Sequence, residues 1–243
     1  MACPAEGRRV ARSRRVRLGD VTPTGRLRLD ALARYLQDIA ADDVDDAGIT
    51  GAWVLRRVGL RIGRLPLFRD DVELVTFCSG TGGRWAERRT TMSLADEATA
   101  GEVSVESVAL WVYVDGQGRP APLEDWFFDL YGAAANGRRV GQRLRLAAPP
   151  DDATRRPWIV RRTDLDVLGH VNNAIAWAAI EDELSRDASL PGGRITDAEL
   201  EYRAPIDEGD ECEIVRQPIE GGFACWVTVD GDVRVSARIL GAA

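Results

Sequence analysis

The sequence predicts an α+β fold made of two similar halves, each with a long helix packed on an antiparallel sheet. Three observations favour it. Apolar residues recur at helical spacing once in each half, runs of β-branched and aromatic residues follow each helix, and both halves repeat the same order of elements. A chain of 243 residues, 45% of them hydrophobic, is long enough to bury such cores.

The first predicted helix begins at Leu29, where apolar side chains recur every three or four residues as far as Ala40, and it ends near Gly48. A weaker extended segment, Arg14 to Leu18, precedes it, and Asp96-Glu97 is one of the turn signals that follow it. Four stronger extended segments make up the rest of this sheet: Trp53 to Ile62, Val72 to Cys78, Trp85 to Leu94 and Val103 to Val114.

The second half repeats this order after a Gly- and Pro-rich linker with a short helix around Trp126. An extended Trp158 to Val160 precedes an apolar helix from Ala174 to Leu184. Strands are then predicted near Ile195 to Tyr202, Glu211 to Arg216, Phe223 to Val229 and Val233 to Leu240. An offset of 182 − 38 = 144 places Gln37-Asp38 on Glu181-Asp182. We therefore predict a domain over 1–135, a linker over 136–155 and a domain over 156–243.

The charged residues of the chain exclude several classes of function. All 32 basic residues are Arg and none is Lys, which excludes a Schiff base, a lysine general base and a P-loop lysine. The net charge of −7 argues against nucleic acid as a partner. No apolar run reaches the roughly 18 residues of a membrane span, and no signal peptide is recognisable. We expect a soluble, cytoplasmic protein with no membrane partner.

The few cysteine and histidine residues limit the metal sites and the catalytic chemistry that are possible. The four cysteines lie far apart without a CxxC pair, so neither a zinc site nor a disulfide framework is predicted, and no metal or other cofactor is expected. The acidic run from Asp42 to Asp46 is expected to be a solvated helix end. His170 is the single histidine of the chain. Acid–base chemistry must therefore use His170, carboxylates or both.

The segment that carries this chemistry lies immediately before the second helix. Asp166 and His170 stand four residues apart on a polar loop, and Asn172-Asn173 lead into the helix. A carboxylate and an imidazole that face one carbonyl, beside backbone amides at a helix start, are what hydrolysis needs. The alternative is capping, because Asp and Asn are preferred N-cap residues.

These residues resemble a known family. Asp-Leu-Asp followed by His-Val-Asn-Asn is similar to the second hot-dog domain of acyl-acyl carrier protein (ACP) thioesterases, the plant enzymes and their bacterial relatives. Leu36-Gln37-Asp38 and Trp53-Val54-Leu55 resemble the first domain. The resemblance implies two tandem hot-dog domains, hydrolysis of a fatty acyl thioester in lipid metabolism, a catalytic second domain and a first domain that helps to hold the acyl chain.

The resemblance also implies roles for single residues. Asp166 matches the family's catalytic Asp and His170 its catalytic His, while the turn at Asn172 and Asn173 would polarise the carbonyl. The chain departs from the family at three places. Leu168 stands where the plant enzymes have Asn, Pro205-Ile206 where they have Glu-Cys, and Ala176 where an aromatic residue is usual. A cysteine nucleophile is therefore not expected there, and Cys212 is not moved into that role.

Substrate contacts are expected from both halves. Trp53 and Trp177 would contact the acyl chain, and Arg56 and Arg57 would bind a phosphopantetheine phosphate or an acidic carrier protein, although a solvated strand face explains these arginines equally well. The expected partners are ACP or coenzyme A thioesters. Three rivals stay open: an acyl-coenzyme A hydrolase, a non-catalytic acyl-binding protein and a dehydratase of hydroxyacyl thioesters. Whether two chains form a homodimer is left open.

Overall fold

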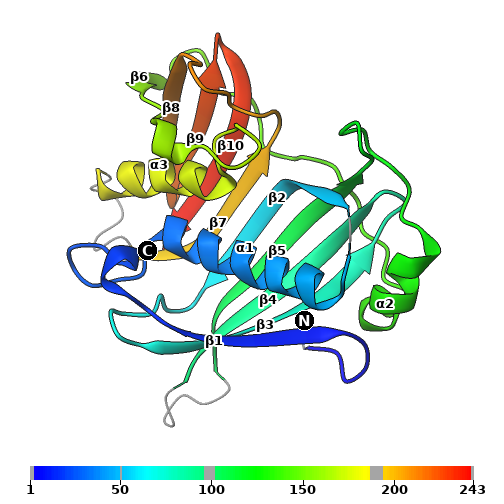
Figure 1. Ribbon diagram of the computed structural model, residues 1–243. Helices are drawn as coiled ribbons and strands as arrows, with labels where there is room; N and C mark the ends of the chain where they lie inside the picture. The colour runs from blue at the N-terminus through cyan, green and yellow to red at the C-terminus, as the bar shows by residue number, and fades with distance from the viewer. Residues whose placement is uncertain (1–2, 50, 96–101, 187–193, 242–243) are drawn as a thin grey trace. The chain divides into compact units, whose positions relative to one another are not determined.

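The computed structural model describes residues 3–49, 51–95, 102–186 and 194–241. It divides into two compact units (Figure 1). The first holds Met1–Leu27, Tyr35–Val58 and Ile62–Arg143, and the second holds Arg28–Arg34, Gly59–Arg61 and Leu144–Ala243. The predicted α+β class is confirmed, with a long helix on antiparallel strands in each half. The turn predicted at Asp96-Glu97 lies outside the described residues.

The first half contains the long helix α1 (Leu29–Asp46) and the helix α2 (Asp125–Ala135), which packs on β3. Its strands lie in the order β1-β3-β4-β5-β2, so the chain does not pair its strands in sequence order. They are β1 (Arg9–Arg15), β2 (Ala52–Ile62), β3 (Asp71–Thr81), β4 (Trp85–Leu94) and β5 (Val103–Val114).

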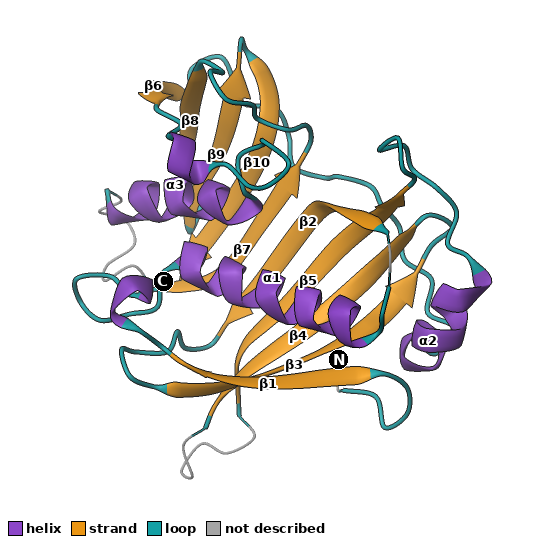
Figure 2. Ribbon diagram, in the orientation of Figure 1, coloured by secondary structure: helices purple, strands orange, loops and turns teal. Residues whose placement is uncertain are grey.

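The second half contains the helix α3 (Asn173–Ser185), which lies on its strands as Figure 2 shows. Its strands follow the order β7-β10-β9-β8-β6. They are β6 (Thr154–Trp158), β7 (Ile195–Tyr202), β8 (Cys212–Ile219), β9 (Gly222–Val229) and β10 (Asp232–Gly241). A one-turn 3₁₀ helix precedes each long helix, at Leu18–Asp20 (η1) and at Arg162–Asp164 (η3).

The two long helices differ as their sequences predict. In α1 one face is apolar, and Leu29, Leu32 and Ile39 are almost fully buried. Each such side chain contributes about 1.5–3 kcal/mol on burial. In α3 the large apolar residues Trp177 and Ile180 are both about 1% exposed. No helix of the described residues is long and apolar enough to cross a membrane.

Two strands were predicted at the wrong place. The strand expected at Arg14 to Leu18 covers Arg9–Arg15 instead, because Leu18 already begins η1. The strand expected at Trp158 to Val160 is Thr154–Trp158, whose pairing with β8 ends at Trp158 opposite Cys212. In both cases the chain leaves its sheet to enter the short helix before a long helix.

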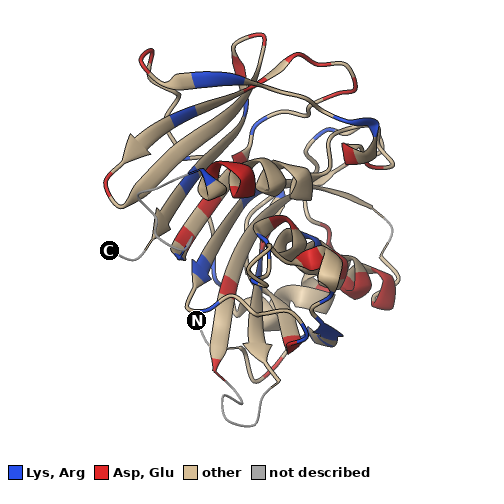
Figure 3. Ribbon diagram, turned by 90° about the vertical axis from the view of Figure 1, so that its left-hand side faces the viewer, with Lys and Arg blue, Asp and Glu red and all other residues tan. Residues whose placement is uncertain are grey.

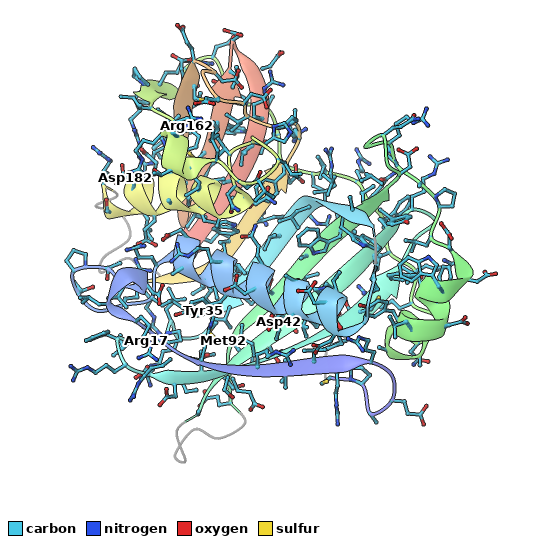
Figure 4. The ribbon with its side chains drawn as sticks, in the orientation of Figure 1. Arg17, Tyr35, Asp42, Met92, Arg162 and Asp182 are labelled. Carbon is cyan, nitrogen blue, oxygen red and sulfur yellow. The ribbon has the colours of Figure 1, made fainter. Side chains whose placement is uncertain are left out.

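The acidic run at the end of α1 is partly solvated, as predicted, with Asp45 and Asp46 exposed, but the prediction is wrong for Asp43, which is buried. Asp42 and Asp46 pair with Arg12 of β1, at 2.8 and 2.7 Å. Asp43 is 2% exposed and pairs with Arg8 and Arg88. Figure 3 shows acidic residues gathered on the helices, and Figure 4 places Asp42 on the side of α1 that faces β1.

Candidate active site

The loop before α3 is a tight reversal of the chain. The backbone N–H of Asp166 donates to the carbonyl of His170 at 2.8 Å, and that of Gly169 donates to the carbonyl of Asp166 at 3.0 Å. Gly169 has a φ of +80°, a conformation that side chains with a Cβ avoid. The reversal therefore brings Asp166 and His170 to opposite arms of one short hairpin.

The first half contains the same reversal before α1, at the offset of 144 that the sequence predicts. The N–H of Thr22 donates to the carbonyl of Arg26 at 2.8 Å, and Gly25 has a φ of +85°. Thr22 thus corresponds to Asp166, and Arg26 corresponds to His170. The turn forms with either pair, and in both halves the side-chain oxygen of the first residue accepts a backbone N–H of the turn, from Arg26 at 3.2 Å in the first half and from Leu168 in the second.

Asp166 lies half-buried on the first arm of the reversal. Its Oδ1 accepts a hydrogen bond from the backbone N–H of Leu168 at 2.8 Å. Among the described residues, no hydrogen bond or ion pair joins its carboxylate to the imidazole of His170. One carboxylate oxygen therefore bonds the turn, and no hydrogen bond to the second oxygen is found in the described part of the chain.

His170 has a partner that the sequence analysis missed. Its Nδ1 lies 2.5 Å from Oδ1 of Asp207, in the loop between β7 and β8. The two side chains are 43% and 59% exposed. A backbone bridge also joins the two residues. Asp207 follows directly on Pro205-Ile206, the place where the chain departs from the family pattern.

Asn172 is the N-cap of α3, which confirms the capping interpretation for this residue. Its Oδ1 accepts from the backbone N–H of Ala174 at 2.9 Å. Its own N–H donates to the carbonyl of Asp164 at 2.9 Å. The side-chain oxygen is therefore occupied by the helix, and the side-chain NH₂ is the part of Asn172 left to contact a substrate.

Asn173 opens α3, and its carbonyl accepts from the hydroxyl of Tyr202 at 3.1 Å. Burial raises the pKa of Tyr202 above its usual range, so the hydroxyl keeps its proton. No hydrogen bond from the Asn173 N–H is found among the described residues. Its counterpart in the first half, the N–H of Leu29, donates to Oε2 of Glu181 at 3.0 Å. In the first half, this helix position therefore binds an anionic oxygen.

A cavity of about 270 Å³ lies in the first unit. Its lining includes four aromatic residues and three alanines, which are Trp53, Trp111, Phe127, Tyr131, Ala40, Ala41 and Ala86, together with the polar side chains of Gln37, Asp45, Glu87 and Arg88. Trp53 stacks at a tilt on Tyr113 and Phe127, with ring centroids 5.2 and 5.5 Å apart. The aromatic and aliphatic part of this lining suits an aliphatic chain.

The other side chains that are predicted to contact the substrate, Trp177, Arg56 and Arg57, are not among the residues that line this cavity. Trp177 is a core residue of α3 in the second unit. Arg56 and Arg57 are half-buried on β2, and the Arg57 guanidinium donates to the carbonyl of Arg143 at 3.2 Å. Figure 4 labels Arg162, which pairs with Glu208 at 3.3 Å. No cluster of His, Cys, Asp or Glu that could hold a metal ion occurs among the described residues.

The cysteines near β8 and β9 are poor nucleophiles. Burial raises the pKa of the Cys212 thiol to about 11 and that of the Cys225 thiol to about 12. Because the thiolate is the nucleophilic form, both thiols are inert at neutral pH. We expect Cys212→Ala to leave kcat for thioester hydrolysis unchanged, with Cys225→Ala as the matched buried control. A loss of kcat in folded Cys212→Ala protein alone would assign the thiol a catalytic role.

Comparisons with known proteins agree across both halves. Residues 7–131 match the acyl-ACP thioesterase N-terminal domain, and residues 147–238 match the acyl-ACP thioesterase C-terminal domain. An uncharacterised protein of Mycobacterium tuberculosis is 28% identical over 224 residues, covering 90% of this chain and 87% of that protein. A chloroplastic acyl-[acyl-carrier-protein] hydrolase of Cuphea viscosissima is 24% identical over 72% of this chain and 47% of its own length.

Solved structures show the same fold. The 12:0-ACP thioesterase from Umbellularia californica superposes with a TM-score of 0.80 at 21% identity, over 98% of each chain. An acyl-ACP thioesterase from Bacteroides thetaiotaomicron superposes with a TM-score of 0.78 at 18% identity, over 96% of this chain and 97% of that one.

Proposed function

Because the chain belongs to the acyl-ACP thioesterase family and is a thioester hydrolase, we propose that its substrates are fatty acyl thioesters of acyl carrier protein, which it cleaves to free fatty acid and carrier thiol. One observation carries the assignment of the site. The repeated turn before the long helix bears Thr22 and Arg26 in the first half, but a carboxylate and the single imidazole in the second. Since the turn of the first half forms without a carboxylate or an imidazole, turn formation alone does not explain this pair.

We propose the following division of roles at this site. Asp166 takes a proton from the attacking water, or attacks the thioester carbonyl itself. His170 orients the water and protonates the departing thiolate. The N–H of Asn173, with the side-chain NH₂ of Asn172, holds the carbonyl oxygen as negative charge develops there. The bond between Leu29 N–H and Glu181 supports this last role, because it puts a carboxylate oxygen at the equivalent backbone position.

The acyl chain is proposed to lie in the cavity of the first unit, with Trp53 in contact with it. The aromatic side chains and alanines of the lining offer apolar surface to an alkyl chain, and the Arg88 guanidinium and the Tyr131 hydroxyl are already paired with Asp43. The carrier is proposed to bind through arginines, for which Arg56 and Arg57 are candidates, since guanidinium binds phosphate in a fork.

The test of this function is release of free thiol. One acyl chain would be presented both on acyl carrier protein and on coenzyme A, and thiol would be followed with a colorimetric reagent. We expect a higher kcat/KM with the carrier protein. Equal or faster hydrolysis of the coenzyme A thioester would favour the acyl-coenzyme A hydrolase instead. Binding of acyl thioesters without thiol release would identify a non-catalytic acyl-binding protein.

The cavity makes a separate prediction about chain length. Ala86 of β4 is 8% exposed and lines the cavity, so Ala86→Leu would fill part of it. We expect the ratio of kcat/KM for the longest to that for shorter substrates to fall at least about tenfold, because one methylene in an apolar pocket is worth roughly 1–3 kcal/mol. Ala109→Leu on β5 is the matched control. An unchanged chain-length profile would remove this cavity from substrate binding.

A further inference from the structure

The loop between β7 and β8 holds the Asp207 backbone at two points. The N–H of Asp207 donates to Oδ2 of Asp210 at 2.8 Å, which closes a tight turn. One residue earlier, the carbonyl of Ile206 accepts from the N–H of Val171 at 2.8 Å. The backbone bridge between His170 and Asp207 lies between these two contacts. The Asp207 side chain therefore reaches the imidazole from a fixed main chain.

The first half builds the same junction without an ionisable pair. The N–H of Leu67 donates to Oδ2 of Asp70 at 2.8 Å, and a backbone bridge joins Leu67 to Arg26. The N–H of Leu27 donates to the carbonyl of Pro66 at 2.8 Å. Leu67 thus occupies the place of Asp207, and Arg26 that of His170. Because the junction also forms with leucine and arginine, the stability of the junction does not explain why an aspartate contacts a histidine in the second half.

The chemistry of the contact decides which nitrogen of His170 is free. A carboxylate only accepts hydrogen bonds, so the ring nitrogen that touches Asp207 is a donor in both the neutral and the charged imidazole. That nitrogen is Nδ1. Nε2 is then the one ring nitrogen that gains and loses a proton. A surface ion pair as exposed as this one contributes only about 0–1 kcal/mol to stability.

We infer that Asp207 is a positioning residue of the hydrolase site, which holds the His170 ring and keeps its neutral form as the Nδ1–H tautomer. The inference rests on the proposed function and adds a residue to it. As the C–S bond of the thioester breaks, the charged imidazole gives its Nε2 proton to the sulfur, and Asp207 keeps Nδ1 protonated. The proton that Asp166 has taken from water then returns to Nε2 through solvent. In the overall reaction, one thioester and one water are converted to one carboxylic acid and one thiol.

Two variants and two measurements test the inference. Asp207→Leu removes the acceptor at Nδ1 and supplies the residue that the first half has at this place, and Glu208→Gln removes the neighbouring carboxylate, which pairs with Arg162 and not with His170. With the single histidine labelled with nitrogen-15, NMR over a series of pH values reports the tautomer of its neutral form without overlap from other imidazoles. Steady-state kinetics on acyl thioesters gives kcat and KM separately.

We expect Asp207→Leu to lose the preference for Nδ1–H, because a leucine side chain cannot accept a hydrogen bond. Its kcat should fall at least about tenfold, a part of the roughly 10²- to 10⁴-fold that general acid–base groups contribute. KM should change little, because the contact acts in the transition state and not in substrate binding. Glu208→Gln should match the wild type in both measurements.

Contrary outcomes are distinct for the two proposals. An unchanged tautomer in Asp207→Leu, or an unchanged kcat with an altered tautomer, would overturn the positioning role. An equal loss of kcat in Glu208→Gln would reduce it to a local charge effect and also overturn it. Absence of thiol release by the wild type would contradict the proposed function. The NMR spectrum of the imidazole would still show whether Asp207 sets the tautomer.

Discussion

Asp166→Asn is expected to lower kcat for acyl thioester hydrolysis by about 10²- to 10⁴-fold. The asparagine oxygen can still accept from the N–H of Leu168, so the turn keeps its hydrogen bond while the site loses its base or nucleophile. The measurement is the rate of thiol release at saturating substrate, with folding checked by circular dichroism.

Asp182→Asn is the matched control for this variant. Asp182 lies near the end of α3, labelled in Figure 4, where it pairs with Arg186 at 3.4 Å, and it is 58% exposed. We expect its kcat to equal that of the wild type. Near-normal turnover by folded Asp166→Asn protein would remove Asp166 from the chemistry and leave the reaction to His170.

Asp43→Asn is expected to lower the free energy of unfolding by about 3–5 kcal/mol, the usual cost of removing one partner of a buried ion pair. Asp43 is 2% exposed, and its two oxygens bind Arg8 at 2.6 Å and Arg88 at 2.7 Å. The hydroxyl of Tyr131 also donates to it at 3.0 Å. Burial and the Asp43 charge together raise the pKa of Tyr131 to about 12, which keeps this donor protonated.

Urea denaturation followed by tryptophan fluorescence measures this effect, with Asp42→Asn as the neighbouring control. Asp42 is 45% exposed and pairs with an exposed Arg12, so its replacement should cost no more than about 1 kcal/mol. Equal stability losses in the two variants would show that the Asp43 cluster is solvated in solution. Arg88 and Tyr131 line the cavity, so Asp43→Asn should also weaken discrimination between acyl chains.

Most helices and strands could be predicted because each carries its own periodicity. The apolar spacing from Leu29 predicts α1, and the β-branched runs predict β2 to β5 within a few residues at either end. The short strands β1 and β6 were misplaced because Arg-rich segments such as Arg9–Arg15 carry no apolar alternation. The bounds of these strands depend on pairing with the neighbouring strand, and the local sequence carries no information about that pairing.

The chemistry of the candidate site divides in the same way. The sequence by itself determined where Asp166, His170 and the Asn pair fall relative to the second long helix. A turn and a helix start are both specified by residues that are close together in the sequence. Only the tertiary structure decided that His170 meets Asp207, 37 residues later, and that Asp43 is buried between two arginines. Such contacts join segments far apart in sequence, and packing rather than spacing brings their charges together.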